Sequence, residues 1–270
     1  MNLIELNNGQ RVPQLGLGVY KVGQDIAVNL IKDAVAAGYR RIDTAALYDN
    51  EVEVGQGVRA CGLDRSDIYV TTKIWNDRHS YDNALKAIDE SLSRLNIDYI
   101  DMLLIHWPVP KQDLYVETWR AFESALESGK VRGIGVSNFH PNHLQKLLDA
   151  SDIPPALNQV ELHPFLQQNE VRAFNAKFGV ATESWSPLGR GRIEGNEVLE
   201  SIAAKHQRSV AQVVIRWHIQ LGNLVIPKTV SPARLAENIA VFDFELDRED
   251  LVAISGLESG MRTGPNPDEF

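Results

Sequence analysis

The chain has 270 residues, of which 44% are hydrophobic and 23% are charged, an ordinary balance for a globular protein with a sizeable core. Acidic residues outnumber basic ones by 36 to 27, and the net charge of −9 argues against nucleic-acid or anionic-membrane partners. The single cysteine, Cys61, excludes an intrachain disulfide, and without a signal-like start or a long apolar run we expect a cytoplasmic protein.

Short apolar strands followed by helical patterns recur along the chain. Before the first of them, residues 3–13 read as a hairpin with an Asn8-Gly9 turn, which we expect to plug one end of a barrel. After the last of them come a helical pattern over residues 247–257 and an irregular, Gly/Pro-rich tail. The predicted strands are Leu15–Val19, Tyr39–Asp43, Ile68–Lys73, Tyr99–His106, Val131–Ser137, Ala156–Glu161, Val180–Trp185 and Leu224–Pro227.

This alternation of strands and helices predicts the fold class. Eight strand–helix units favour an α/β fold of the (β/α)8 TIM-barrel type, as a single domain over residues 1–270, with an extra C-terminal helix and tail. An open dinucleotide-binding sheet would carry G-x-G-x-x-G after its first strand. Here Gly16 and Gly18 are present, but Lys21 stands where the third glycine belongs.

Polar side chains end three successive predicted strands, namely Asp43, Lys73 and His106, and Tyr48 follows in the next loop after Asp43. Active sites of such barrels lie at the C-terminal ends of the strands, so we expect all four groups at one mouth. Asp43 would keep Lys73 charged, and the ammonium would lower the pKa of Tyr48 and make it a usable proton donor. His106 would orient a substrate carbonyl oxygen.

Such a set can protonate a developing alkoxide, but it needs a hydride donor, and a nicotinamide is the economical source. Each residue alone reads more simply as a strand-end or capping group. Lys73 could also act through a Schiff base, as in an aldolase. The combination of the four groups favours carbonyl reduction over these alternatives.

The stretches GYRRIDTAALYDNE, VTTKIW and LLIHWP, which carry these four residues, resemble signatures of the aldo-keto reductase family. VRGIGVSNF, NQVELHPF, ESWSPLGRG and VIPKTVSPARLAENI resemble further segments of that family in the same order, from about Leu15 to Phe244. Within the family the chain is most similar to the bacterial 2,5-diketo-D-gluconic acid reductases. The resemblance implies NADPH-dependent reduction of aldehydes and ketones, with Tyr48, Asp43, Lys73 and His106 as catalytic residues.

The resemblance also implies an extended NADPH across the barrel mouth. At the nicotinamide carboxamide and ring the implied residues are Ser137, Asn138, Gln159 and Trp185. Along the pyrophosphate they are Ser186, Pro187 and Leu188. At the 2′-phosphate and adenine they are Lys228, Thr229, Arg234, Glu237 and Asn238. A phosphate monoester needs charged donors, which Lys228 and Arg234 can supply. Taken alone, these two residues read more simply as solvated charges at a helix start.

The aromatic residues Tyr20, Trp75 and Trp107 are the expected walls of the substrate pocket, together with His106. Short loops around them imply an open cleft for small polar carbonyls such as 2,5-diketo-D-gluconate. His140 and His143 form H-x-x-H, but no third ligand has suitable spacing, and we expect no metal. We expect a monomer whose partner is a small-molecule carbonyl. An NADPH-binding regulatory or interaction module with little turnover remains the alternative.

Overall fold

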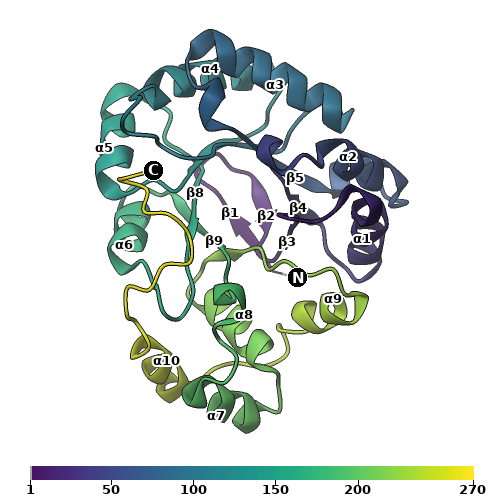
Figure 1. Cartoon of the computed structure of the whole chain (residues 1–270), viewed down its shortest axis with the longest axis vertical. Coiled ribbons are helices and arrows are strands. Elements are labelled where there is room, and N and C mark those ends of the chain that lie inside the picture. The colour runs from purple at the N-terminus through teal and green to yellow at the C-terminus, as the bar shows by residue number, and fades with distance from the viewer. Residues whose placement is uncertain (1) are drawn as a thin grey trace.

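The structure is a computed structural model and describes residues 2–270. Within this range, parallel strands form one eight-stranded sheet in which each strand is hydrogen-bonded to the next in chain order (Figure 1). These strands are β3 (Leu17–Gly18), β4 (Arg41–Asp43), β5 (Tyr69–Ile74), β6 (Met102–Ile105), β7 (Ile134–Ser137), β8 (Leu157–Glu161), β9 (Ala181–Trp185) and β10 (Leu224–Val225). Each falls on a predicted strand, and most begin one to three residues later than predicted.

The two edges of the sheet meet, which closes it into the predicted barrel. Leu15, just before β3, bridges Val225 of β10 in parallel. The backbone N–H of Gly16 donates to the Val225 carbonyl at 2.9 Å, and the N–H of Val225 donates to the Gln14 carbonyl at 2.9 Å. With both edges paired, the strand ends surround one mouth.

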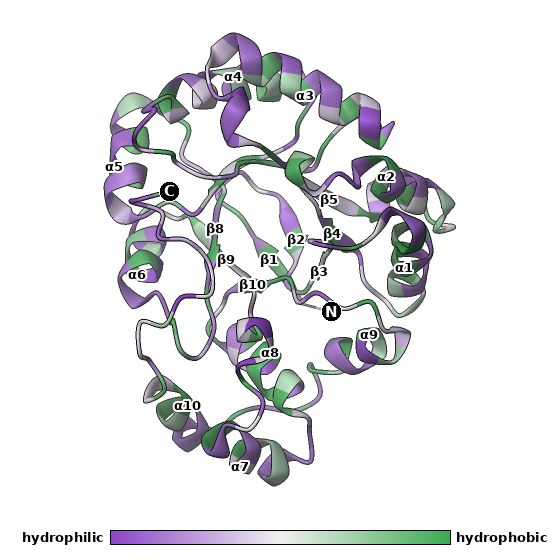
Figure 2. Ribbon diagram, viewed as in Figure 1, coloured by the Kyte–Doolittle hydropathy of each residue, from purple (hydrophilic) through white to green (hydrophobic). Residues whose placement is uncertain are grey.

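Helices cover the outside of this barrel (Figure 1). Their buried, apolar sides face the sheet and their polar sides face outward (Figure 2), as the helical spacing of apolar residues requires. The helices are α1 (Gln24–Ala36), α2 (Glu51–Ala60), α3 (Tyr81–Leu95), α4 (Tyr115–Glu127), α5 (Pro141–Ala150), α6 (Asn169–Lys177), α7 (Glu197–His206), α8 (Val210–Gln220), α9 (Pro232–Ile239) and α10 (Arg248–Ser255). Helix α10 is the predicted last helix, and its N-terminus is capped by Asp247.

The N-terminal hairpin, β1 (Leu3–Glu5) and β2 (Arg11–Pro13), lies in the centre of the ring of strands in Figure 1. Its buried residues Leu6 and Val12 belong to a cluster with Met102, Leu157 and Leu224. Each of these three is the first residue of its strand, so the hairpin covers the end of the barrel opposite the mouth. The predicted plug is therefore confirmed. Among the described residues, no helix is both long and apolar enough to cross a membrane.

Candidate active site

The structure brings Asp43, Tyr48, Lys73 and His106 together at the C-terminal ends of neighbouring strands. Asp43 ends β4, Lys73 lies near the end of β5, and His106 directly follows β6. Tyr48 ends a short 3-10 helix, Ala46–Tyr48, in the loop between β4 and α2. The rings of Tyr48 and His106 meet edge to face, with their centroids 5.8 Å apart.

Lys73 is fully buried, and its ammonium has three hydrogen-bond acceptors. It donates to Asp43 Oδ1 at 2.5 Å, to the backbone oxygen of Thr44 at 2.8 Å and to Tyr48 Oη at 3.5 Å. Burial lowers the pKa of Lys73, but the charge of Asp43, the phenolate that Tyr48 can form and the hydrogen bond to Asp43 outweigh burial, and the net shift is upward. A charged lysine with every N–H engaged is not a nucleophile, which argues against the Schiff-base alternative.

The pKa of Tyr48 is shifted in the direction opposite to our expectation. Burial raises it above the ordinary value of 10.0, the Lys73 charge lowers it by less, and Asp43 raises it again. Lys73 lowers the pKa of Tyr48, as expected, but the expectation of a lowered pKa overall is wrong because it left out desolvation. Tyr48 therefore carries its proton at neutral pH, and Lys73 offsets part of the penalty that burial imposes on the phenolate.

His106 is held as a neutral imidazole. Burial, followed by the charge of Lys73 and by His79, places its pKa well below the ordinary value of 6.5. Its backbone oxygen accepts from Asn138 Nδ2 at 2.9 Å, and its Nδ1 is buried without a hydrogen-bond partner in residues 2–270. A neutral histidine at the mouth can donate one hydrogen bond to a carbonyl oxygen without carrying charge.

Gln159 connects this group to the barrel interior. Its Nε2 donates to Asp43 Oδ2 at 2.7 Å and to Glu183 Oε2 at 2.9 Å. Glu183, on β9, in turn forms a buried ion pair with Arg41 on β4. Sequence reasoning did not single out Glu183 or Arg41. The available signal was a charged residue within each predicted barrel strand, which needs a partner when it is buried.

The residues expected at the nicotinamide also lie at this mouth. Ser137 Oγ donates to the Gln159 backbone oxygen at 2.8 Å, and Trp185 Nε1 donates to Asn138 Oδ1 at 2.8 Å. Asn138 adopts a left-handed backbone (φ 64°), and so does Ser186 (φ 47°), just after β9, so the chain turns sharply at both points. Within the described residues, the amide oxygen of Gln159 accepts no hydrogen bond, and Trp185 is partly exposed. A free amide acceptor and a partly exposed indole at the same mouth fit a carboxamide carried on an aromatic ring.

A second group lies at the N-terminus of α9, which follows β10. Lys228 and Arg234 are exposed, and neither forms an ion pair within the described part of the chain. Thr229 Oγ1 accepts from the Ser231 N–H at 3.1 Å, which leaves its hydroxyl hydrogen available. Two unpaired cations, a free hydroxyl and a helix N-terminus match the chemistry of a phosphate. Pro187, Leu188, Glu237 and Asn238 lie in the segments that flank this region.

The three aromatic residues expected in the substrate pocket surround the catalytic group. The Tyr20 ring lies 5.0 Å from that of Tyr48, and the Trp75 ring lies 5.0 Å from that of His106. Trp107 packs against the C-terminal residue, Phe270, with ring centroids 4.5 Å apart. Phe270 thus adds a fourth aromatic wall, which the sequence did not reveal because the tail carries no periodic pattern.

The tail is held across the mouth by Glu161, the last residue of β8. Thr263 donates to Glu161 Oε1 through its backbone N–H and its hydroxyl, both at 2.5 Å, and the Gly264 N–H donates to Oε2 at 3.0 Å. A Cβ on Gly264 would lie 2.5 Å from Trp185 Cη2, so only glycine allows this close approach. The tail therefore passes directly beside the indole expected to meet the nicotinamide.

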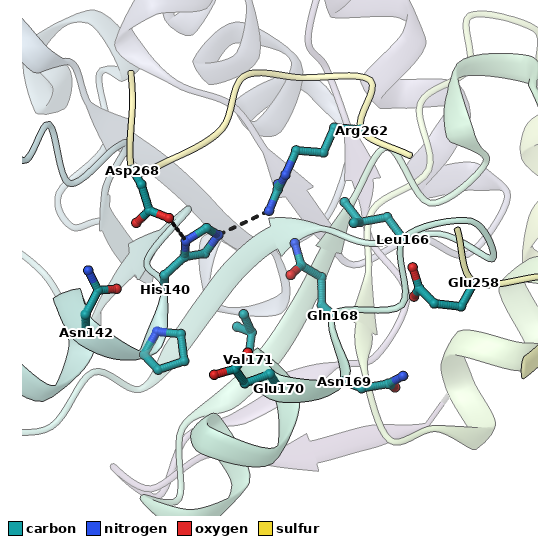
Figure 3. Close-up of a pocket in the computed structure, with 11 residues that line it drawn as sticks. His140, Asn142, Leu166, Gln168, Asn169, Glu170, Val171, Glu258, Arg262 and Asp268 are labelled. Carbon is teal, nitrogen blue, oxygen red and sulfur yellow. Dashed lines mark hydrogen bonds and ion pairs between the residues drawn. The ribbon is translucent and has the colours of Figure 1, made fainter. Parts of the chain in front are cut away.

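A separate cavity of about 760 Å³ lies between the start of α5, the start of α6 and the tail (Figure 3). In it His140 Nδ1 pairs with Asp268 at 2.8 Å, and Arg262 donates to His140 Nε2 at 3.2 Å. His140 is the N-cap residue of α5, with Pro141 first in the helix, as the sequence suggested. Among residues 2–270, no three His, Cys, Asp or Glu side chains are grouped to hold a metal ion.

The chain resembles known proteins over nearly its whole length. The pattern that defines the aldo/keto reductase family matches residues 14–259. The methylglyoxal reductase DkgA of Yersinia pestis is 47% identical, over 99% of this chain and 97% of that protein. The glyoxal reductase of Bacillus subtilis is 47% identical, over 99% of this chain and 96% of that protein. A Gox0644 variant, whose crystal structure was determined in complex with NADPH, is 47% identical in sequence. The match covers 99% of this chain and 97% of that chain, and the two structures superpose with a TM-score of 0.95.

Proposed function

The chain belongs to the aldo/keto reductase family, and we propose that it reduces small polar aldehydes and ketones, with Tyr48 as the proton donor. It is an NADPH-dependent oxidoreductase acting on carbonyl compounds. The observation that carries the assignment of roles is the convergence of a buried ion pair, a protonated phenol and a neutral imidazole at one barrel mouth.

Each residue has a distinct part in the reaction. NADPH, when bound, supplies the hydride. His106 donates a hydrogen bond to the substrate carbonyl oxygen and fixes its position beside the Tyr48 hydroxyl. Tyr48 gives its Oη proton to that oxygen as negative charge develops there. Lys73, kept charged by Asp43, stabilises the phenolate that remains, because its Nζ lies 3.5 Å from Tyr48 Oη.

For the cofactor, we propose that two groups of residues with different chemistry bind its two ends. Ser137, Asn138 and Gln159 hold the carboxamide, and Trp185 lies on the nicotinamide ring. Ser186, Pro187 and Leu188 follow the pyrophosphate. Lys228, Thr229 and Arg234 bind the 2′-phosphate, and Glu237 and Asn238 reach the adenine. The support is the unpaired charge at the start of α9 and the single unused acceptor of Gln159.

We propose that the substrate binds among the aromatic side chains of Tyr20, Trp75, Trp107 and Phe270, which ring contacts connect to Tyr48 and His106. The 47% identical proteins named methylglyoxal reductase and glyoxal reductase make 2-oxoaldehydes the first candidates. The 2,5-diketo-D-gluconate suggested by the sequence is the second. Both classes carry two carbonyl groups on a short chain, which aromatic walls accommodate without a deep apolar channel.

The proposal is tested by following the absorbance of NADPH with methylglyoxal, glyoxal, 2,5-diketo-D-gluconate and an aromatic aldehyde, with NADH in parallel. We expect consumption with the small dicarbonyls and a preference for NADPH. Binding of NADPH, detected by quenching of tryptophan fluorescence, without turnover of any carbonyl would support the regulatory-module alternative instead.

The role of Tyr48 is tested with Tyr48→Phe, which we expect to lower kcat roughly 100- to 10,000-fold while NADPH binding stays within a few-fold of normal. Tyr20→Phe is the matched control, because it removes a second hydroxyl whose ring packs on Tyr48 in the same mouth. Equal losses in the two variants would contradict the assignment of the proton donor.

A further inference from the structure

Beneath the mouth, the barrel interior holds a buried ion pair that takes no direct part in the proposed chemistry. Arg41 and Glu183 are both fully buried and face each other across the barrel from β4 and β9. Arg41 also donates to the backbone oxygens of Gln14 and Val225, both at 3.2 Å, where the barrel closes. A Cβ on Gly16 would lie 2.8 Å from Arg41 Nε, so the chain keeps a glycine where the guanidinium needs space.

The two carboxylate oxygens of Glu183 have different hydrogen-bond partners. Oε1 pairs with Arg41, whereas Oε2 accepts from Gln159 Nε2 at 2.9 Å. The same Nε2 donates to Asp43 Oδ2 at 2.7 Å. A primary amide has two N–H donors, and both are directed at carboxylates, which only accept when ionised. The orientation of the Gln159 amide is thus determined from both sides.

We propose that Glu183 is a positioning residue that, with Asp43, orients Gln159 so that it presents only its carbonyl oxygen to the nicotinamide carboxamide. The inference rests on the proposed cofactor role of Gln159. A rotated amide would direct its oxygen at two carboxylates and leave Asp43 Oδ2 and Glu183 Oε2 without a donor, which the buried site strongly disfavours. Gln159 therefore selects the NH2 side of the carboxamide and rejects its oxygen.

Arg41 makes this arrangement possible. A buried carboxylate without a countercharge takes up a proton, and a protonated Glu183 could donate to Gln159 as well as accept from it. Burial raises the pKa of Glu183 on balance, the Arg41 charge opposes this rise, and the ion pair leaves Glu183 able to accept from Gln159. The Arg41 charge also balances Glu183, so that Asp43 remains the partner of Lys73. The four buried charges then sum to zero, and the ammonium beside Tyr48 keeps its effect.

The test compares two dinucleotides that differ only in the group that Gln159 would contact. NADP⁺ has a carboxamide, and its 3-acetylpyridine analogue has a methyl group in place of the NH2. Dissociation constants are measured by tryptophan fluorescence for the native protein, Glu183→Gln and the double variant Arg41→Met/Glu183→Leu. Binding of 2′,5′-ADP, which lacks the nicotinamide, reports whether the phosphate end is intact in each protein.

We expect the native protein to prefer NADP⁺ over the analogue by about two- to tenfold, the range that one hydrogen bond supplies. In both variants this ratio falls toward one while 2′,5′-ADP binds as before. The double variant removes both charges at once and so leaves no buried charge unpaired, which keeps the test open if the single variant does not fold. Glu51→Gln is the control, since Glu51 is also a buried carboxylate paired with an arginine, Arg94.

Variants that bind 2′,5′-ADP and keep the native ratio would overturn the role of Glu183 and leave the proposed function standing. A native protein that binds neither NADP⁺ nor 2′,5′-ADP would overturn both. A loss of the ratio in Glu51→Gln as well would also overturn the inference, because any buried carboxylate would then have the same effect.

Discussion

Replacing Asp43 by asparagine tests whether the buried ion pair maintains both the fold and the active site. The Asp43 and Lys73 side chains are only 3% and 0% exposed, and their charged atoms lie 2.5 Å apart. Asparagine has the same shape but no charge, so Asp43→Asn leaves the Lys73 ammonium buried without a countercharge. We predict a less stable protein with much lower turnover.

The magnitude follows from the geometry. At 2.5 Å and an effective dielectric constant of about 20, the attraction is about 7 kcal/mol, most of which offsets the desolvation of the two ions. Removal of one partner of a buried pair costs about 3–5 kcal/mol, and we expect this loss for Asp43→Asn at neutral pH. The pair raises the pKa of Lys73 above 10.5, so its contribution is present below that pH and is lost as the pH rises through the raised pKa.

The assay is urea unfolding followed by tryptophan fluorescence, with the free energy taken from the midpoint and slope. Asp89→Asn is the matched control, because Asp89 and Lys130 also lie 2.5 Å apart but are 57% and 41% exposed. Water screens that pair, and we expect a loss of about 0–1 kcal/mol. Equal losses in the two variants would refute the reasoning, since the pairs differ in burial and in the further hydrogen bonds that the buried pair makes.

Three further predictions concern other parts of the molecule. In Gly55→Ala, the new Cβ would lie 1.8 Å from the backbone oxygen of Leu95 at the end of α3, so we expect the free energy of unfolding in urea to fall by about 3 kcal/mol or more. Gly256→Ala is the control, because its Cβ meets only ordinary contacts, and we expect a loss of less than about 1 kcal/mol. Burial raises the pKa of Glu161, but hydrogen bonds from His163 and the tail hold it at about 2, so the stabilisation is complete above pH 4.5 and is lost as the pH falls toward 2. The protection factor of the Thr263 amide, which is its exchange rate relative to the intrinsic rate at the same pH, should therefore fall only below pH 4.5, and a fall near neutral pH would contradict the contact. The pKa of His106 lies well below 6.5, so its ring proton signals in NMR spectra should not shift between about pH 6 and 8, and a titration there would show that the imidazole is not desolvated.

The strands, the helices and the placement of the four chemical groups could be predicted because they depend on local patterns. Continuous apolar runs mark β6 (MLLI) and β10 (the first two residues of LVI), and helical spacing marks segments between strands. In a parallel barrel the last residue of each strand points to the same mouth, so Asp43, Lys73 and His106 needed only their positions in the chain to be brought together.

What the tertiary structure alone decided depends on contacts between residues far apart in the chain and on burial. Glu161 meets Thr263, 102 positions later, and Arg41 meets Glu183, 142 positions later, with no local pattern linking the partners. The upward pKa shift of Tyr48 has the same origin, because desolvation depends on everything packed around the phenol. By itself the sequence determined which groups reach the mouth, since strand order and strand ends are local properties. Their protonation, their partners and the tail that covers them were decided only in three dimensions, because electrostatic energies depend on distance and on access to water.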